Sequence, residues 1–129
     1  MSAPGPTVTP YLCVQDGRAA LAWYAEALGA QVGEPWVDED GRIGHAELSV
    51  GDHQIFLSES YPEHGVEPPL EGRGAPMSLV LEVADCAAAL ERARAAGAQV
   101  TREPDEQVER IVATFLDPGG HRWMVVQER

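Results

Sequence analysis

Two stretches of the chain share one order of hydrophobic and polar positions. Each opens with an alternating apolar run, continues with an apolar stripe at helical spacing, and ends in further alternating runs separated by turn residues. In the first stretch the opening run is 7–14 and the helical stripe is 18–28. In the second stretch a similar helix follows Asp85 and stops at Gly97. The pattern predicts two modules, each a strand, a helix and three strands.

Turn and cap residues delimit the predicted elements. Asp16 is the expected N-cap of the first helix, and Gly29 is its expected stop. The three strands after each helix are predicted over 31–37, 44–50 and 54–58, and over 99–103, 111–116 and 122–127. The turns between them are marked by Asp40-Gly41, Gly51-Asp52 and Asp117-Pro118-Gly119-Gly120. The fold class is therefore α+β, with two tandem β-α-β-β-β modules.

Short sequence motifs that recur in the same order indicate that the modules are duplicates. Gly29-Ala30-Gln31-Val32 recurs as Gly97-Ala98-Gln99-Val100, and Arg42-Ile43 recurs as Arg110-Ile111, both at an offset of 68 residues. A chain of 129 residues suits one domain. We expect a single domain over 1–129, with module one at about 7–59, a linker at 60–76 and module two at about 77–127.

Composition and charge narrow the set of partners. The net charge is −12 and all nine basic residues are arginine, so an acidic surface is expected to repel nucleic acid and anionic lipid. The sequence shows neither a signal-peptide pattern nor an apolar run of the roughly 20 residues that a membrane span needs. A cytoplasmic location is therefore expected, with no nucleic-acid or membrane partner. Cys13 and Cys86 lack metal-type spacing and are expected to be reduced, structural thiols.

The duplicated pattern resembles the vicinal-oxygen-chelate superfamily, which contains glyoxalases, bleomycin resistance proteins and dioxygenases. The resemblance covers about residues 7 to 127. Its local motifs are Asp16-(x)5-Ala22-Trp23-Tyr24-(x)3-Leu28-Gly29, Gly44-His45-Ala46-Glu47-Leu48 and Asp117-Pro118-Gly119-Gly120-His121-Arg122-Trp123. The stretch Glu59–Gly65 is similar to a glyoxalase-like subgroup. The resemblance implies a curved eight-stranded mixed sheet with helices outside, a ligand in its concave cup, and a homodimer.

Catalytic members of that superfamily hold a divalent metal with ligands from the first and last strand of each module. Carried onto this sequence, the four ligand positions are Thr9, Phe56, Ser78 and Met124. None is a usual ligand for such a metal, which takes nitrogen and oxygen donors from His, Glu or Gln. The resemblance is thus to members that lack the metal ligands, and we expect neither a metal nor a cofactor.

Strand alternation predicts which side chains line the cup. The expected lining consists of Thr9, Tyr11, His45, Glu47, Phe56, Ser78, Glu82, Phe115 and Met124. Such a mixture of aromatic, apolar and a few polar groups is typical of an organic-ligand pocket. Two other interpretations remain open: a core filled by Phe56 and Met124, and a surface hydrogen-bonded pair of His45 and Glu47.

Three functions compete at this point. The favoured one is metal-free binding of a small organic molecule in the cup, with drug sequestration of the bleomycin-resistance type as one form of it. The alternative is a metal-dependent lyase, isomerase or dioxygenase with a displaced site built from His45, Glu47 and either Glu59 or Glu82. A third is metal-free acid–base catalysis by Glu47 or Glu82 with His45. The lost ligand set favours a binding protein over an enzyme.

Overall fold

A computed structural model describes residues 5–129 of the chain. Module one contains β1 (Tyr11–Cys13), α1 (Gly17–Leu28), β2 (Gln31–Val32), β3 (Trp36–Val37), β4 (Ile43–Val50) and β5 (His53–Ser58). A one-turn 3-10 helix, η1 (Pro62–His64), lies in the linker. Module two contains β6 (Ser78–Glu82), α2 (Cys86–Ala95), β7 (Gln99–Glu106), β8 (Arg110–Leu116) and β9 (Arg122–Glu128). None of the helices in the described part of the chain is long and apolar enough to cross a membrane.

The helices begin where their caps predict. The Asp16 side chain accepts a hydrogen bond from the Ala19 amide at 3.1 Å, and Asp85 accepts one from the Ala88 amide at 3.0 Å. These bonds satisfy one of the amides that each helix start leaves without a backbone partner. α1 ends at Gly29, whose φ of 67° lies in the left-handed region that favours glycine.

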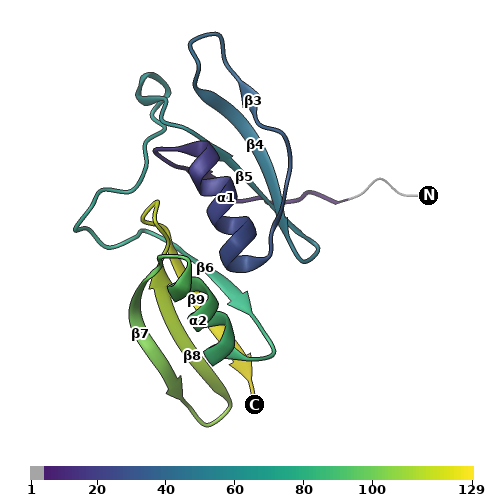
Figure 1. The fold of residues 1–129 in the computed structure, drawn as a ribbon, viewed down its shortest axis with the longest axis vertical. Coiled ribbons are helices and arrows are strands. Elements are labelled where there is room, and N and C mark those ends of the chain that lie inside the picture. The colour runs from purple at the N-terminus through teal and green to yellow at the C-terminus, as the bar shows by residue number, and fades with distance from the viewer. Residues whose placement is uncertain (1–4) are drawn as a thin grey trace.

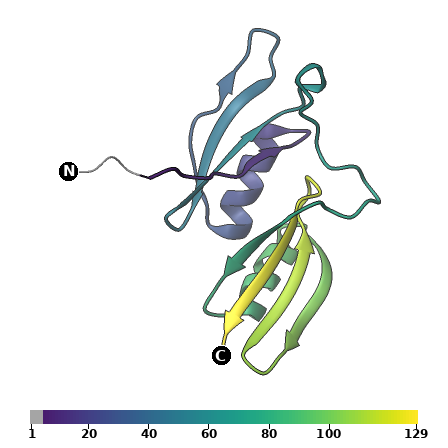
Figure 2. The ribbon, with the colours of Figure 1, turned by 180° about the vertical axis from the view of Figure 1, so that it is seen from behind.

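Each module forms its own mixed sheet, which confirms the α+β class with two modules. The order in the first sheet is β1-β5-β4-β2, with β3 also pairing with β4, and the order in the second is β6-β9-β8-β7. The pairs β1/β5 and β6/β9 are parallel, and the pairs β4/β5 and β8/β9 are antiparallel. Figure 1 shows both helices on the near side of their sheets. The opposite faces of the two sheets are seen from behind in Figure 2.

The two sheets do not join into one curved sheet within this chain. Among residues 5–129 no strand of module one pairs with a strand of module two, so β1 and β6 each keep one open edge. β1 is also shorter than the predicted run 7–14, since Pro6 and Pro10 cannot donate to a ladder. The predicted strand 31–37 is interrupted in the same way, by Gly33-Glu34-Pro35.

The modules meet through their helices and the inner faces of their sheets. Trp23 and Tyr24 of α1 reach into module two, where the Phe115 and Trp123 rings stack at 6.3 Å. The Tyr24 hydroxyl and the Trp123 Nε1–H (2.9 Å) both donate to Oδ2 of Asp117, whose side chain is buried. Trp23 Nε1 donates to the Ala96 carbonyl at 2.8 Å. One shared core therefore lies between the helices and both sheets.

Two further contacts tie the linker and the helix start to module one. The Glu59 carboxylate accepts from the Gly17 amide at 2.7 Å and from the Ile43 amide at 2.8 Å. The Arg42 guanidinium pairs with Glu63 of η1 at 2.7 Å and lies 3.9 Å from the centre of the Tyr61 ring. The linker is thus anchored at its start, and both Glu59 oxygens are engaged.

The Tyr24–Asp117 contact predicts a stability loss. In Tyr24→Phe the buried Asp117 carboxylate loses one of its donors, which costs about 1–3 kcal/mol in the free energy of unfolding. Urea denaturation measures this loss. The matched control is Tyr61→Phe, since the Tyr61 hydroxyl contacts the half-buried Asp38 at 3.2 Å, where water can replace the lost donor, and its removal should change stability less. Equal losses in both variants would contradict this role of Asp117.

Alkaline pH should weaken the same contact. Burial, and then repulsion by the Asp117 carboxylate, raise the pKa of Tyr24 well above its usual value. A pKa raised by folding gives stability that is present below the unfolded-state pKa of about 10 and is lost as the pH rises through the folded-state value. The stability gap between the native chain and Tyr24→Phe should therefore narrow above about pH 10. Urea midpoints measured across this range check it, and a constant gap would be the contrary result.

Candidate ligand-binding face

The open face of the first sheet gathers four of the predicted side chains. Strand register places Tyr11 of β1 opposite Phe56 of β5, and Phe56 opposite Glu47 of β4. His45 lies two residues before Glu47 on the same strand and points to the same side. The alternate residues of these strands, such as Leu12 and Leu48, are buried against α1. Alternation therefore puts these four side chains on the open face and Leu12 and Leu48 in the core.

Three rings of this face pack edge to face. The Phe56 ring centre lies 4.8 Å from that of His45 and 5.7 Å from that of Tyr11, and the Tyr11 and His45 centres lie 5.4 Å apart. Tyr11 is 53% exposed, so the group is an accessible surface and not a filled core. We call these three residues the aromatic shelf. A shelf of this kind offers a planar apolar molecule a contact area with little conformational cost.

A chain of hydrogen bonds runs along the shelf. The Tyr11 Oη lies 2.9 Å from the Gly44 carbonyl oxygen and 2.8 Å from His45 Nδ1. His45 Nε2–H donates to Glu47 Oε2 at 2.9 Å, and Gln54 Nε2 donates to Glu47 Oε1 at 3.3 Å. Burial raises the pKa of Tyr11, so its phenol stays protonated at neutral pH. We call Tyr11, His45 and Glu47 the polar network.

The open face of the second sheet is mostly apolar. Val80 of β6 pairs with Met124 of β9, and Met124 pairs with Thr114 of β8. Val80 is 64% exposed, which makes it one of the larger apolar groups at the surface. At its ends, Ser78 accepts a 2.6 Å hydrogen bond from Arg122, and Glu82 is exposed.

Phe115 does not line this face, contrary to the sequence prediction. Its side chain is fully buried in the core and stacks on Trp123. The residue that corresponds to Glu47 is Thr114, because Thr114 pairs with Met124 as Glu47 pairs with Phe56. The connection between β8 and β9 is longer than the one between β4 and β5, which shifts the inside–outside parity of β8 by one residue.

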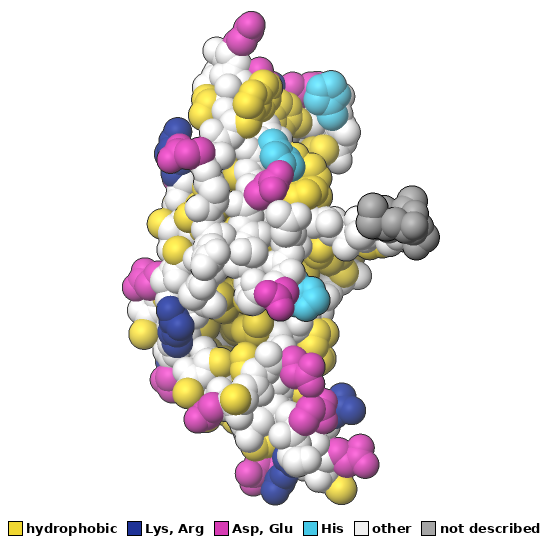
Figure 3. All heavy atoms as spheres, turned by 90° about the vertical axis from the view of Figure 1, so that its right-hand side faces the viewer, with side chains coloured by type: hydrophobic (Ala, Val, Ile, Leu, Met, Phe, Trp, Pro, Cys, Tyr) yellow, Lys and Arg dark blue, Asp and Glu magenta, His cyan; other side chains and the backbone are white. Residues whose placement is uncertain are grey.

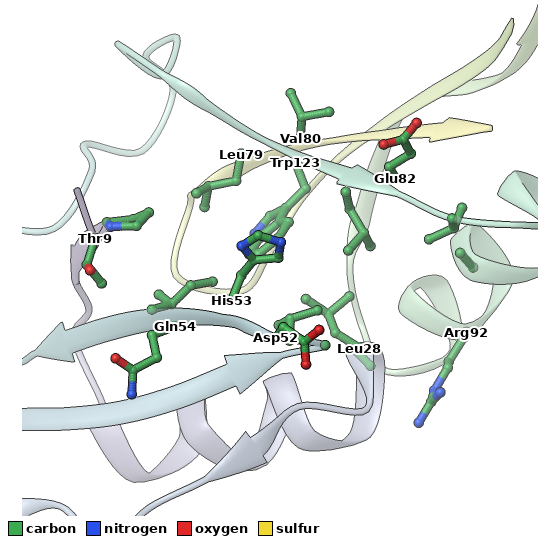
Figure 4. A pocket seen from close by; sticks show the side chains of 18 of the residues that line it. Thr9, Leu28, Asp52, His53, Gln54, Leu79, Val80, Glu82, Arg92 and Trp123 are labelled. Carbon is green, nitrogen blue, oxygen red and sulfur yellow. The ribbon is translucent and has the colours of Figure 1, made fainter. Parts of the chain in front are cut away.

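A groove of about 1250 Å³ separates the modules on the side of the open edges. In Figure 4 the side chains of Thr9, His53 and Gln54 line it from module one, and those of Val80 and Glu82 line it from β6. Thr9 thus lies in the groove and not on the aromatic shelf. Gln54 and Val80 also belong to the two open faces, so the groove runs between them. Figure 3 shows one side of the molecule, where hydrophobic side chains reach the surface beside histidine and acidic groups.

The residues do not fit the divalent metal of the catalytic relatives. The four positions that the resemblance assigns to metal ligands carry Thr9 and Phe56 in module one and Ser78 and Met124 in module two, and none of them has an imidazole or carboxylate donor. Within residues 5–129 no group of three or more His, Cys, Asp or Glu side chains is close enough to hold an ion. Glu59, the other donor that a displaced site would need, is held by the Gly17 and Ile43 amides.

Three features of the site were missed at the sequence level. Gln54 shares the parity of Phe56, so alternation could have found it. The Gly44 carbonyl and Arg122 carry no sequence signal for their roles. Trp36 of β3 packs over Gly44, since its ring comes within 2.8 Å of where a Gly44 Cβ would stand.

Known proteins resemble this chain over nearly its full length. It is 30% identical to an uncharacterized protein of Mycobacterium bovis over 128 residues, covering 95% of this chain and 83% of the relative. A protein of known structure from Pseudomonas aeruginosa is 28% identical, with a TM-score of 0.71 and coverage of 96% of this chain and 98% of that one. A hypothetical protein of Staphylococcus aureus has a TM-score of 0.75 at 18% identity, covering 97% of this chain and 95% of that one, which shows the shared fold.

A family model describes the same region. The model of the Glyoxalase/Bleomycin resistance protein/Dioxygenase superfamily matches residues 6–125, which spans both modules and the linker. The observed order of strands and helices in each module agrees with the fold that this resemblance implies. The chain therefore belongs to the Glyoxalase/Bleomycin resistance protein/Dioxygenase superfamily.

Proposed function

We propose that this protein binds a small organic molecule on its open sheet faces without a metal ion. The observation that carries the proposal is the aromatic shelf of Tyr11, His45 and Phe56, which is accessible and has polar groups at one end. Ligand sites commonly combine an apolar wall with a few oriented polar groups. Drug sequestration of the bleomycin-resistance type is the form of binding that family membership supports.

The charge of the molecule supports capture of a basic ligand. At a net charge of −12, the long-range field raises the local concentration of cations and speeds their association. Glu47 places an acidic group beside the shelf, with its two oxygens held by His45 and Gln54. Sequestration needs no covalent step, and it suits the cytoplasmic location that we propose for this protein.

We propose further that the complete cup forms between two copies of the chain. Each module presents one open face, and β1 and β6 are the edge strands of their sheets on the side of the groove. Large apolar side chains, including Met77 and Val80, are exposed in and beside β6. A homodimer that sets the first sheet of one copy beside the second sheet of the other would cover these groups and enclose the shelf. Stable interfaces bury about 800 Å² per partner.

Ligand binding can be tested with a panel of aromatic drugs, cationic and neutral, in a thermal-shift assay. A ligand that binds only the folded chain raises the unfolding temperature. Phe56→Ala should weaken binding of the best ligand by about tenfold or more, because truncation of an anchoring aromatic residue commonly costs over 1 kcal/mol. Leu70→Ala, which truncates an exposed apolar side chain in the linker, is the matched control. Binding that disappears with a chelator, or no binding by any compound, would contradict the proposal.

The dimer can be tested by sedimentation. Val80→Glu places a charge on the apolar face of β6 and should shift the protein toward the monomer, because an unpaired charge is costly to bury. Val108→Glu is the matched control, since Val108 is 95% exposed in the connection between β7 and β8. A native chain that sediments as a monomer at high concentration would rule the dimer out.

A further inference from the structure

We infer that the ligand is a weakly acidic hydroxyl compound, a phenol or an enol, and that the polar network accepts its proton. The inference rests on the proposed function, because it concerns the same shelf. It adds to the capture of cations by long-range charge a site that selects its ligand through proton transfer. Three observations carry it: the number of hydrogens in the network, the engagement of Glu47, and the position of the Phe56 ring.

The network contains more close contacts than hydrogens. Its three contacts join Tyr11 Oη to the Gly44 carbonyl oxygen (2.9 Å), Tyr11 Oη to His45 Nδ1 (2.8 Å) and His45 Nε2 to Glu47 Oε2 (2.9 Å). A neutral phenol and a neutral imidazole bring one polar hydrogen each. Two hydrogens cannot fill three contacts between these atoms. The arrangement therefore has a place for one more proton, on His45.

Glu47 is held where it stabilises that additional proton. Its Oε2 accepts from His45, and Gln54 fixes its Oε1 at 3.3 Å. A carboxylate in this position orients an imidazole and stabilises the imidazolium formed when the other ring nitrogen takes a proton. Of the side chains that the structure places against the His45 ring, which are Tyr11, Glu47 and Phe56, only Glu47 is acidic. It lies at Nε2, across the ring from the Nδ1 that contacts Tyr11.

The aromatic shelf sets the ring of the ligand beside the network. The Phe56 ring centre lies 4.8 Å from that of His45 and 5.7 Å from that of Tyr11. A ligand ring that packs on Phe56 can bring an attached hydroxyl to the Tyr11 Oη. Tyr11 is the group that would touch the ligand, and His45 and Glu47 act behind it.

The transfer is balanced without any co-reactant. The ligand O–H bond breaks as its proton moves to Tyr11 Oη, and the proton that Tyr11 carried moves to His45 Nδ1. The electron pair of the broken bond stays on the ligand oxygen. The products are a ligand oxyanion, which accepts the Tyr11 hydrogen in place of the Gly44 carbonyl, and an imidazolium that donates to Tyr11 Oη and Glu47 Oε2. No atom is oxidised or reduced.

The test uses 4-nitrophenol, whose phenolate is coloured, and 4-nitroanisole, which has the same ring but no acidic hydrogen. Spectrophotometric titration of 4-nitrophenol with saturating protein should move its ionisation midpoint down by about one pH unit or more, a tenfold change in the ionisation constant. His45→Gln and Glu47→Gln should still bind the ring but lose most of this shift. His53→Gln, which alters a histidine of the groove outside the network, should keep it. Circular dichroism confirms that each variant is folded.

The outcomes separate the two proposals. If the native protein binds both compounds but leaves the midpoint of 4-nitrophenol unchanged, the proton transfer is wrong and the binding function stands. The same holds if His45→Gln retains the full shift. If the native protein binds neither compound, both proposals are overturned for aromatic ligands of this size. A shift that is lost in His45→Gln and in Glu47→Gln, and kept in His53→Gln, supports the inference.

Discussion

The buried carboxylate of Asp117 is the constraint on which the arrangement of the two modules depends. It accepts from Tyr24 of α1 and Trp123 of β9 on one oxygen, and from the His121 amide at 3.0 Å on the other. A buried charge is tolerated only when such donors surround it, so neither module can move away without exposing an unsatisfied group. The contact joins the helix side of module one to module two. It therefore commits the helices to the interface between modules and leaves the opposite sheet faces free.

The two free faces are unequal, although the modules are duplicates. The register makes Val80 the counterpart of Tyr11, Thr114 the counterpart of Glu47 and Met124 the counterpart of Phe56. The first face carries a hydrogen-bonded network beside aromatic rings, while the second is apolar at Val80 and Met124 and has Ser78, Arg122 and Glu82 at its ends. A molecule that bridges such faces would need a polar end and an apolar body. Divergence of the two copies has thus turned a symmetric fold into an asymmetric surface.

Much of this fold could be predicted from local signals. Asp16, Asp85 and Gly29 sit where caps belong, and alternation, starting from the positions that the resemblance assigns to the cup, put Tyr11, His45, Glu47 and Phe56 on one face. Such signals act over a few residues, which is why sequence patterns carry them.

The predictions that were wrong or incomplete concern features that depend on loop length or on contacts between residues far apart in the chain. Phe115 was misplaced because one connection is longer than its counterpart in the other module. The Tyr24–Asp117 contact joins residues 93 apart in the chain, which no local pattern reports. The separation of the two sheets is likewise decided by how whole modules pack and not by a local pattern. The polar network could be predicted only in part. The sequence pairs His45 with Glu47, but their link to Tyr11 depends on the register between β1, β5 and β4.

The overall charge of the protein favours a cationic ligand, whereas the contacts at the aromatic shelf favour a ligand with an acidic hydroxyl. The net charge of −12 acts over roughly a Debye length, about 8 Å at physiological salt, and so governs how fast a cation arrives. At the shelf itself, both oxygens of Glu47 are already taken by His45 and Gln54. A cation would have to displace those donors, whereas a hydroxyl can join the network through Tyr11 without breaking them. Long-range charge can therefore speed the arrival of a basic molecule, while the short-range contacts favour the one that also carries an acidic hydroxyl.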